Sequence, residues 1–402
     1  MKTESVLVLG DYRQTLTVAR SLARAGYRVI VGSEDEHVFT RYSRAVAERW
    51  RYPDPAKSEP AFLEALSSIL AQRPDIRWIF PVGETQLIAI VHHAEQLSTA
   101  VGVVISTPAV VPVCLDKPRL YVAAAACHVP SAPLRVVTDY AALSAALETL
   151  GYPCVVKPSS AFFSVHDRKA LILHCSNDLA RQLPEWPEGN AALIVQRYAS
   201  GWRHNCHFLA HDGKLLAYFE QQVLRTDCQD GTGYGVDGIS GVPSESLRRY
   251  CEQLLTHLNY SGAGCVQWLV NARDGSASLL EINPRLDATC AIPYYCGYDF
   301  PLMALNYARY RRGELTAPPR NDAPYLAGRR GVWFVGDLKG LLTAARHGRV
   351  GMQGAMVWWW RAVRAFLSAD MHLTWSRADP LPALFMAVRL VLSPLQALLR
   401  RR

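Results

Sequence analysis

Short apolar runs alternate with amphipathic segments over the first hundred residues. Four of the runs predict strands, at 6–9, 28–31, 78–81 and 102–105. Three segments between them have the spacing of helices, at 14–25, 59–72 and 85–97. Strands that alternate with helices predict a parallel sheet with right-handed crossovers. The loop after the first run is Gly10-Asp-Tyr-Arg-Gln14 rather than Gly-x-Gly-x-x-Gly, which does not favour a dinucleotide site.

A second pattern predicts a hairpin between residues 266 and 285, with a tight turn at Asp274-Gly275. Glu281 and Asn283 are two positions apart and therefore share a face of their strand. A turn at 274–275 places Gln267 opposite Glu281, with Arg285 next along the same face. Oxygen-bearing side chains beside a cation suit Mg²⁺ bound to nucleotide phosphates. An edge hairpin with solvated polar residues is the alternative.

The glutamine followed by Glu-Ile-Asn-Pro-Arg resembles the metal-binding end of ATP-grasp enzymes. It is most similar to the synthetase domains of carbamoyl-phosphate synthetase and to carboligase members of the superfamily. The resemblance covers roughly residues 1–315. It implies that Gln267, Glu281 and Asn283 hold Mg²⁺, with Mn²⁺ as an alternative, between the phosphates of ATP. It also implies that Arg285 touches the transferred phosphoryl group.

Two lysines are candidates for the nucleotide phosphates. Lys117 opens a predicted helix, and Lys157 ends a buried strand, where a lysine needs an anionic partner. The resemblance implies that both contact phosphates, and that Ser159 and Ser160 donate hydroxyls. Most relatives have a glycine-rich loop here whose amides wrap the phosphates, but residues 159–168 contain no glycine. This departure leaves a nucleotide-binding protein without turnover as an alternative.

The segment at 193–201 resembles the adenine-binding hinge of the same enzymes. The resemblance implies that the chain at Gln196, Arg197 and Tyr198 binds the adenine edge. Gln196 stands where relatives usually have glutamate, and its carbonyl oxygen can still accept from the exocyclic amine. His204 stands where relatives place a ribose-binding residue, and a structural histidine is the alternative.

Candidates for the acceptor side of the site lie between residues 220 and 287. Five glycines in the eleven residues 231–241 predict a loop without regular structure that closes over substrate, or a flexible linker. Arg225 suits a carboxylate or an acyl phosphate, because a guanidinium group matches those oxygens. Asp287 and Glu84 are weaker candidates, since a turn or the start of a helix explains them equally well.

Composition is ordinary for an enzyme of two or three domains, with 402 residues, of which half are hydrophobic. The ten cysteines form no Cys-x-x-Cys pair and no cluster of zinc spacing, which favours reduced thiols. No secretory signal opens the chain, so we expect a cytoplasmic protein.

The basic excess of the chain belongs to its last eighty residues. Residues 323–402 hold twelve Lys or Arg against three Asp or Glu, among tryptophans and aliphatic side chains. No apolar run is long enough to span a membrane, but basic amphipathic helices suit the inner face of an anionic membrane. We therefore consider peripheral membrane association through 353–402, against helices that simply pack on the core. Nucleic acid is not expected, because the basic residues are mixed with aliphatics.

The expected architecture is an ATP-grasp fold of α/β and α+β parts. It has a Rossmann-like pre-ATP-grasp domain at 1–112, an ATP-grasp domain at 113–315 with a small lid at about 128–196, and a helical appendage at 316–402. The resemblance implies a carboxylate–amine ligase acting through an acyl phosphate on small-molecule substrates. A bicarbonate or carbamate kinase is the second interpretation. Homodimers are common among the resembling proteins, which leaves a homodimer open.

Overall fold

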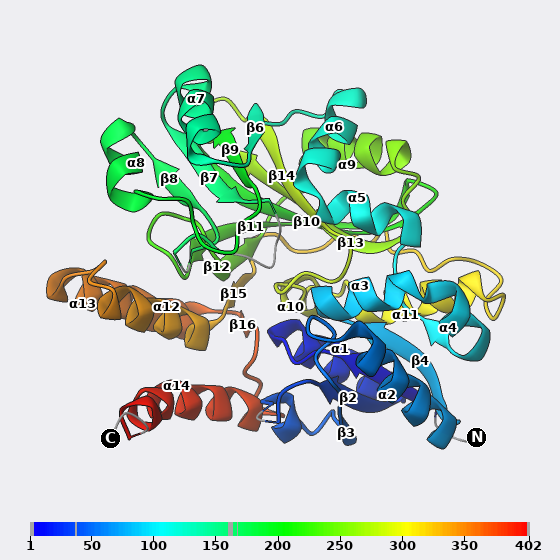
Figure 1. Cartoon of the computed structure of the whole chain (residues 1–402). Helices are drawn as coiled ribbons and strands as arrows, with labels where there is room; N and C mark the ends of the chain where they lie inside the picture. The colour runs from blue at the N-terminus through cyan, green and yellow to red at the C-terminus, as the bar shows by residue number, and fades with distance from the viewer. Residues whose placement is uncertain (1–3, 37, 160–163, 167, 400–402) are drawn as a thin grey trace.

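Three sheets organise the chain in the computed structural model, which describes residues 4–36, 38–159, 164–166 and 168–399. They are a five-stranded, a seven-stranded and a four-stranded sheet. In Figure 1 the five-stranded sheet lies at the bottom and the other two lie above it. The last helices project to the left of these layers.

The five-stranded sheet is parallel throughout, as the alternating pattern predicts. In the order β3-β2-β1-β4-β5, its strands are β1 (Ser5–Leu9), β2 (Arg28–Ser33), β3 (Glu48–Arg51), β4 (Ile76–Pro81) and β5 (Gly102–Val103). Its helices are α1 (Arg13–Arg24), the 3₁₀ turn η1 (Thr40–Tyr42), α2 (Glu59–Gln72), α3 (Glu84–His92) and α4 (Ala94–Ala100). Strand β1 is buried along its whole length, because helices cover both faces of the sheet.

Two features of this layer differ from the expectation. Strand β3 reads Glu-Arg-Trp-Arg at an edge of the sheet, so no apolar run marks it in the sequence. The single helix expected at 85–97 is divided into α3 and α4. The division falls at His93, whose φ of −120° and ψ of 17° lie outside helical geometry.

The four-stranded sheet is antiparallel and carries Lys157 and Gln196. In the order β6-β9-β7-β8, its strands are β6 (Leu134–Val137), β7 (Cys154–Pro158), β8 (Leu171–Leu173) and β9 (Leu193–Arg197). The helices that lead to it or pack on it are η2 (Pro108–Val110), α5 (Val111–Leu115), α6 (Lys117–Ala126), α7 (Tyr140–Leu150) and α8 (Ser176–Gln182). Asp116 caps α6 by accepting from the amide of Arg119 at 2.9 Å, which places Lys117 in the first helical turn.

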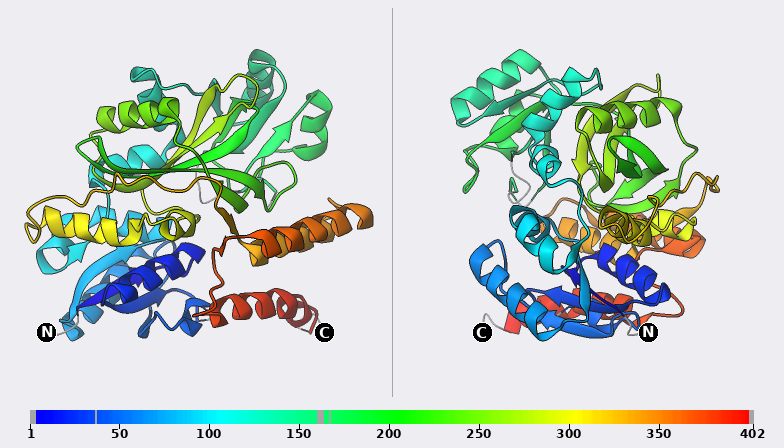
Figure 2. Two further views of the ribbon diagram at one scale, coloured as in Figure 1. Left: turned by 180° about the vertical axis from the view of Figure 1, so that it is seen from behind. Right: turned by 90° about the vertical axis from the view of Figure 1, so that its right-hand side faces the viewer.

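The seven-stranded sheet carries the predicted hairpin. In the order β14-β13-β10-β11-β12-β15-β16, its strands are β10 (Trp202–His211), β11 (Lys214–Thr226), β12 (Gly235–Ser240), β13 (Gly262–Val270), β14 (Ala277–Asn283), β15 (Arg330–Val332) and β16 (Met371–His372). Its associated helices are α9 (Glu245–His257), α10 (Ala291–Tyr295) and α11 (Phe300–Arg311). The right-hand view of Figure 2 shows this sheet beside the four-stranded sheet, above the N-terminal layer.

The hairpin has the predicted register but a longer connection. Gln267 pairs with Glu281 across β13 and β14. The expected two-residue turn at Asp274-Gly275 is instead the end of a loop that runs from Asn271 to Ser276. Gly275 takes a φ of +70° there, a conformation that glycine adopts without strain.

The glycine-rich segment at 231–241 contains a regular strand, so the expectation of an irregular loop is wrong. Strand β12 pairs with β11 on one side and with β15 on the other. A Cβ atom on Gly238 would lie 3.2 Å from Cδ1 of Ile292. The glycine therefore lets α10 pack closely against a strand that both neighbours hold in place.

The C-terminal region is more than a helical appendage, because its strands β15 and β16 complete the seven-stranded sheet. Its helices are α12 (Phe334–Arg346), α13 (Met352–Ser368) and α14 (Leu381–Leu399). Helix α14 returns to the N-terminal layer, where Phe385 packs on Tyr42 with ring centroids 4.6 Å apart. Among the described residues, no helix is both long and apolar enough to cross a membrane.

Candidate active site

The hairpin brings the three predicted metal ligands together. Gln267 and Glu281 are directly opposite each other, so their side chains leave the sheet on one face. Asn283 is two positions from Glu281 and donates from Nδ2 to its Oε1 at 3.3 Å. Gln267 donates from Nε2 to Oδ2 of Asp287 at 3.4 Å. Both amide nitrogens are thus engaged, and the carbonyl oxygens of Gln267 and Asn283 are the atoms suited to a cation.

Two lysines from different elements approach the carboxylate of this group. Nζ of Lys117 lies 4.0 Å from Oε2 of Glu281. Burial raises the pKa of Glu281, but Lys117, Lys169 and Lys157 outweigh burial and leave that pKa below its ordinary value. Because several cations surround one carboxylate, the group carries excess positive charge and would attract an additional anion.

Lys157 is the most deeply buried of these cations. It donates from Nζ to Oε1 of Gln196 at 2.8 Å, and Nζ lies 5.8 Å from the centre of the Tyr121 ring. Burial, reinforced by the charge of Lys117, lowers the pKa of Lys157 to about 7, although Glu281 opposes the shift. A buried ammonium group with a neutral amide as its hydrogen-bond partner is suited to bind an anion.

The hinge residues are placed differently from the expectation. Gln196 accepts from Lys157 and donates from Nε2 to the carbonyl of Ala132 at 3.2 Å. The amide of Arg197 donates to Pro133 at 2.9 Å, and that of Tyr198 donates to Pro153 at 3.0 Å. These two N–H groups are therefore not available to an adenine edge, because neighbouring strands use them.

His204 does not share a face with the metal group, which corrects its expected ribose-binding role. Asn205 is the cross-strand partner of Gln267, so its sequence neighbour His204 points to the opposite face of the sheet. There, Nδ1 of His204 lies 2.9 Å from Oε1 of the buried Glu220. That carboxylate also accepts from the amide of Ser244 at 2.9 Å, which makes this a structural cluster.

The phosphate loop is described only in part. Ser160 lies outside the described residues, as do Phe162 and Phe163. The hydroxyl of Ser159 donates to the carbonyl of Ala192 at 3.0 Å. This hydrogen bond joins the end of β7 to the start of β9, so the hydroxyl of Ser159 is already used within the protein.

Arg225, which we expected to bind a substrate, forms ion pairs with carboxylates of the protein. Its guanidinium donates from Nη1 and Nη2 to the two oxygens of Asp337 at 3.1 and 2.6 Å. Its Nε donates to Asp237 at 3.2 Å. Both acids are buried, so the guanidinium group of Arg225 joins α12 to the sheet through protein carboxylates.

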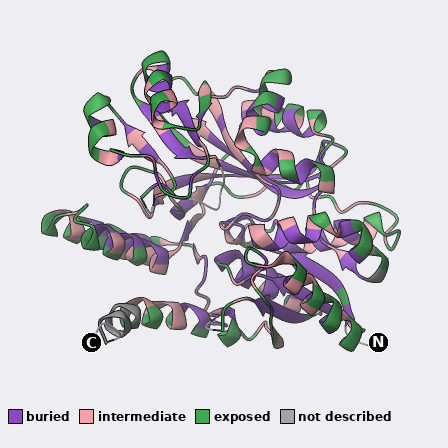
Figure 3. Cartoon of the chain, in the orientation of Figure 1, coloured by how far each residue is buried: buried purple, intermediate pink, exposed green. Residues whose placement is uncertain are grey.

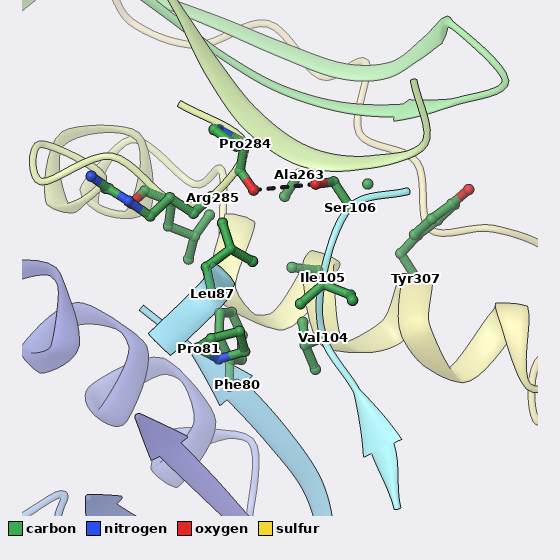
Figure 4. A pocket seen from close by; sticks show the side chains of 13 residues that line it. Phe80, Pro81, Leu87, Val104, Ile105, Ser106, Ala263, Pro284, Arg285 and Tyr307 are labelled. Atoms are coloured by element: carbon green, nitrogen blue, oxygen red, sulfur yellow. Dashed lines mark hydrogen bonds between the residues drawn. The ribbon is translucent and has the colours of Figure 1, made fainter. Parts of the chain in front are cut away.

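Arg285 lies where the two large sheets meet. Its Nη2 is 3.8 Å from Oε2 of Glu84, the first residue of α3. Its buried Nε has no hydrogen-bond partner among the described residues. Figure 4 shows the guanidinium directed away from a pocket between Leu87, Ile105 and Tyr307. Most of the residues that line this pocket are apolar.

Sequence reasoning missed a charged group beside the metal triad. Arg203 leaves β10 on the same face as Asn205, and burial lowers its pKa against the opposing effects of Asp287 and Glu281. Arg13, from the start of α1, stacks 4.4 Å from the Trp333 ring and donates to the carbonyl of Gly235 at 2.7 Å. Arg13 comes from a helix of the N-terminal layer and Arg203 from the seven-stranded sheet, so no local spacing in the sequence predicts that they lie near each other.

Asp287 links this group to the hairpin. It accepts from the side chains of Asn205 and Gln267 at 3.4 Å each, and from the amide of Thr289 at 2.8 Å. Burial raises its pKa, but His207, Thr289 and Arg13 together lower it to about 2. The sequence offered a turn as an equal alternative, and the structure places this carboxylate in the site.

Comparisons with known proteins find sequence similarity in the part of the chain that contains the hairpin. A family model for the ATP-binding domain of the carbamoyl-phosphate synthase L chain matches residues 237–310, which include the hairpin. The arginine-specific carbamoyl phosphate synthase large chain of Geobacillus stearothermophilus is 23% identical over 308 residues. The match covers 72% of this chain and 28% of that protein, so the chain spans under a third of its relative.

Two solved structures show the fold. Biotin carboxylase from Campylobacter jejuni, as an ATP-analogue complex, has a TM-score of 0.61 at 15% identity, covering 82% of this chain and 74% of that one. L-amino acid ligase from Bacillus licheniformis has a TM-score of 0.60 at 14% identity, and the match covers 77% of this chain and 74% of that one. The fold is the ATP-grasp fold, as the sequence predicts. The chain is thus similar to ATP-grasp proteins in sequence over residues 237–310 and in its overall fold.

Proposed function

We propose that the chain is an ATP- and Mg²⁺-dependent ligase that joins a carboxylate to an amine through an acyl phosphate. One observation carries the proposal: Glu281 lies beside Asn283 and opposite Gln267, with the ammonium group of Lys117 4.0 Å away. An oxygen-ligand group next to a surplus of lysines suits a divalent cation bound to phosphates. The L-amino acid ligase of the same fold supports the type of reaction.

The residues present fit the nucleotide and the cation. Gln267, Glu281 and Asn283 offer oxygen atoms, which Mg²⁺ and Mn²⁺ both accept. Lys117 and Lys157 would bind the phosphates. ATP would supply the phosphoryl group that activates the carboxylate, and the protein would contribute positioning and charge neutralisation.

Arg285 is the proposed contact of the phosphoryl group in transfer. Its unpartnered Nε is a buried donor that an anionic oxygen would satisfy. Its pairing with Glu84 brings the N-terminal layer to the same point. An arginine held in this way can stabilise charge that develops during the reaction.

The second candidate is a kinase that phosphorylates bicarbonate or carbamate. It is favoured by the family model, which describes a carbamoyl-phosphate synthase domain and matches the hairpin itself. The two candidates differ in the acceptor, and therefore in the substrate that stimulates ADP release.

The deciding experiment measures ADP and phosphate release from ATP and Mg²⁺ with pooled carboxylates and pooled amines, and separately with bicarbonate. The ligase predicts release that requires both pools and that Glu281→Gln abolishes without a change in Tm. Glu252→Gln, at a partly exposed glutamate of α9, is the matched control and should keep full activity.

The other results have distinct meanings. Release stimulated by bicarbonate alone would favour the kinase. Full turnover by Glu281→Gln would overturn the assignment of the cation site. ATP that raises the Tm without release under any condition would favour a binding protein.

A further inference from the structure

Helix α13 exposes an apolar face that the rest of the described chain does not cover. Its exposed apolar side chains are between 51% and 84% accessible and follow one side of the helix: Met352, Met356, Trp359, Trp360 and Leu367. The opposite side, with Trp358, Ala362 and Ala365, is buried. Figure 3 shows the paired helices α12 and α13 projecting from the body, with exposed residues along their outer surface.

Helix α14 has a similar exposed row. Its described members are at least 44% accessible and are spaced three or four residues apart: Leu381, Leu384, Val388 and Leu392. The start of the helix is fixed to the N-terminal layer, because Asp379 accepts from Arg20 at 3.0 Å and from Ser43 at 2.6 Å. Helices α13 and α14 both project on the same side of the molecule in Figures 1 and 2. We call these two rows together the C-terminal apolar surface.

The charge around this surface has one sign. Residues 338–369 contain no Asp or Glu. They contain exposed basic side chains at Lys339, Arg346, Arg349, Arg361 and Arg364.

The acids of the C-terminal region are all engaged elsewhere. Asp337 pairs with Arg225, Asp370 with Arg329, and Asp379 with Arg20. None of the three lies among the arginines of α13. In the part of the chain that the structure describes, no carboxylate forms an ion pair with Arg361 or Arg364. Their positive charges are therefore not neutralised by the protein and can attract an anionic partner.

We propose that the C-terminal apolar surface binds an anionic lipid bilayer, with α13 lying in the plane of the interface. Trp359 and Trp360 suit the headgroup region, because an indole ring combines an apolar body with a polar N–H. Arg361 and Arg364 can place their stems on the apolar side and their guanidinium groups among lipid phosphates. Nucleic acid matches this surface less well, because its grooves are polar and would not bury methionine and leucine side chains.

Buried polar contacts join α13 to the seven-stranded sheet. Trp358 of α13 donates from Nε1 to Asp337 at 2.6 Å, and Asp337 is the partner of Arg225 on β11. Trp333, which precedes α12, stacks on Arg13 beside Asp287. The surface that we propose to bind lipid is therefore attached to the body of the protein by buried side-chain contacts.

The test is sedimentation of the full chain with phosphatidylglycerol vesicles and with phosphatidylcholine vesicles. We expect binding to the anionic vesicles that weakens as salt is added, and little binding to the neutral ones. Arg361→Glu with Arg364→Glu should lower the partition coefficient by more than about 25-fold, since each basic residue near such a surface contributes about fivefold. Trp359→Ser with Trp360→Ser should also weaken binding without changing Tm.

The matched control is Arg77→Glu with Arg273→Glu, which changes the net charge equally at exposed positions on β4 and in the hairpin loop. It should bind as the wild type does. Equal binding to both vesicle types would overturn the proposal, as would binding that the Arg361 and Arg364 variant retains. Sedimentation velocity showing a dimer that the two tryptophan substitutions dissociate, with no vesicle binding, would assign the surface to a second copy.

Discussion

The ammonium group of Lys157 and the amide oxygen of Gln196 are 2.8 Å apart on adjacent strands of the four-stranded sheet. Each side chain stands where the sequence predicts a nucleotide contact, and the two are hydrogen-bonded to each other. An arriving phosphate would meet a lysine that is already held in position. Its proton, however, is held weakly, with a pKa of about 7.

The first prediction concerns the pH dependence of nucleotide binding. A phosphate near Lys157 would raise its pKa, so binding above pH 7 must take up a proton. Affinity should fall by up to about tenfold per pH unit as pH rises above about 7. Calorimetry in two buffers of different ionisation enthalpy measures the uptake directly.

Two variants make this measurement specific. Lys157→Met should remove the proton uptake together with most of the affinity. Lys214→Met, at the exposed start of β11, should change neither. Proton uptake that survives in Lys157→Met would show that another group titrates.

The second prediction concerns Asp287→Asn. Its carboxylate is buried near Arg13 and Arg203, and the neutral amide would leave both cations without that compensation. We expect a loss of about 3 kcal/mol in the free energy of unfolding, measured by urea denaturation. Asp274→Asn, in the exposed hairpin loop, should cause little change.

Acid titration of the same variant gives an independent readout. The folded pKa of Asp287 is about 2, against an ordinary value of 3.8. Its stabilising effect is therefore present above about pH 4 and is lost as pH falls toward 2. The acid limb of the stability curve should be shallower in Asp287→Asn, and an unchanged limb would refute the assignment.

The third prediction concerns how closely α12 packs on the sheet. A Cβ atom on Gly340 would lie 2.4 Å from the carbonyl oxygen of Asp227, which is backbone and cannot move aside easily. Gly340→Ala should therefore destabilise the protein by about 1–3 kcal/mol, although alanine is favoured within helices. The contrast is Gly354→Ala in α13, where the nearest atom is a methyl group of Val350 at 2.9 Å. There we expect a gain of up to about 1 kcal/mol, and equal shifts in the two variants would contradict the packing argument.

The sequence predicted those parts of the site that depend on local periodicity. The pairing of Gln267 with Glu281 was predicted from the position of the turn, but in the structure it also depends on a register shift between Gln267 and Trp268 that the sequence did not indicate. The parallel N-terminal sheet follows in the same way from alternating apolar runs. In both cases the prediction rests on the periodicity of apolar residues along the chain.

Side chains whose partners are distant in the chain were not predictable. Arg225 and Asp337 are 112 positions apart, and a free arginine at the end of a strand looks the same in sequence as a paired one. His204 is the other example, because its role depends on which face of β10 meets Gln267. Arg13 and Arg203 reach Asp287 only after separate sheets have assembled, so no spacing rule could have found them.

The position of β15 and β16 has a consequence for the order in which the protein is made. Strand β12 has its outer partner, β15, only after residue 332 has been synthesised, although the hairpin with Glu281 precedes it by some fifty residues. During that interval β12 is an open edge with unpaired backbone groups, the kind of surface that other chains can join. During synthesis on the ribosome, this edge therefore stays open to other chains until β15 has emerged and paired with it.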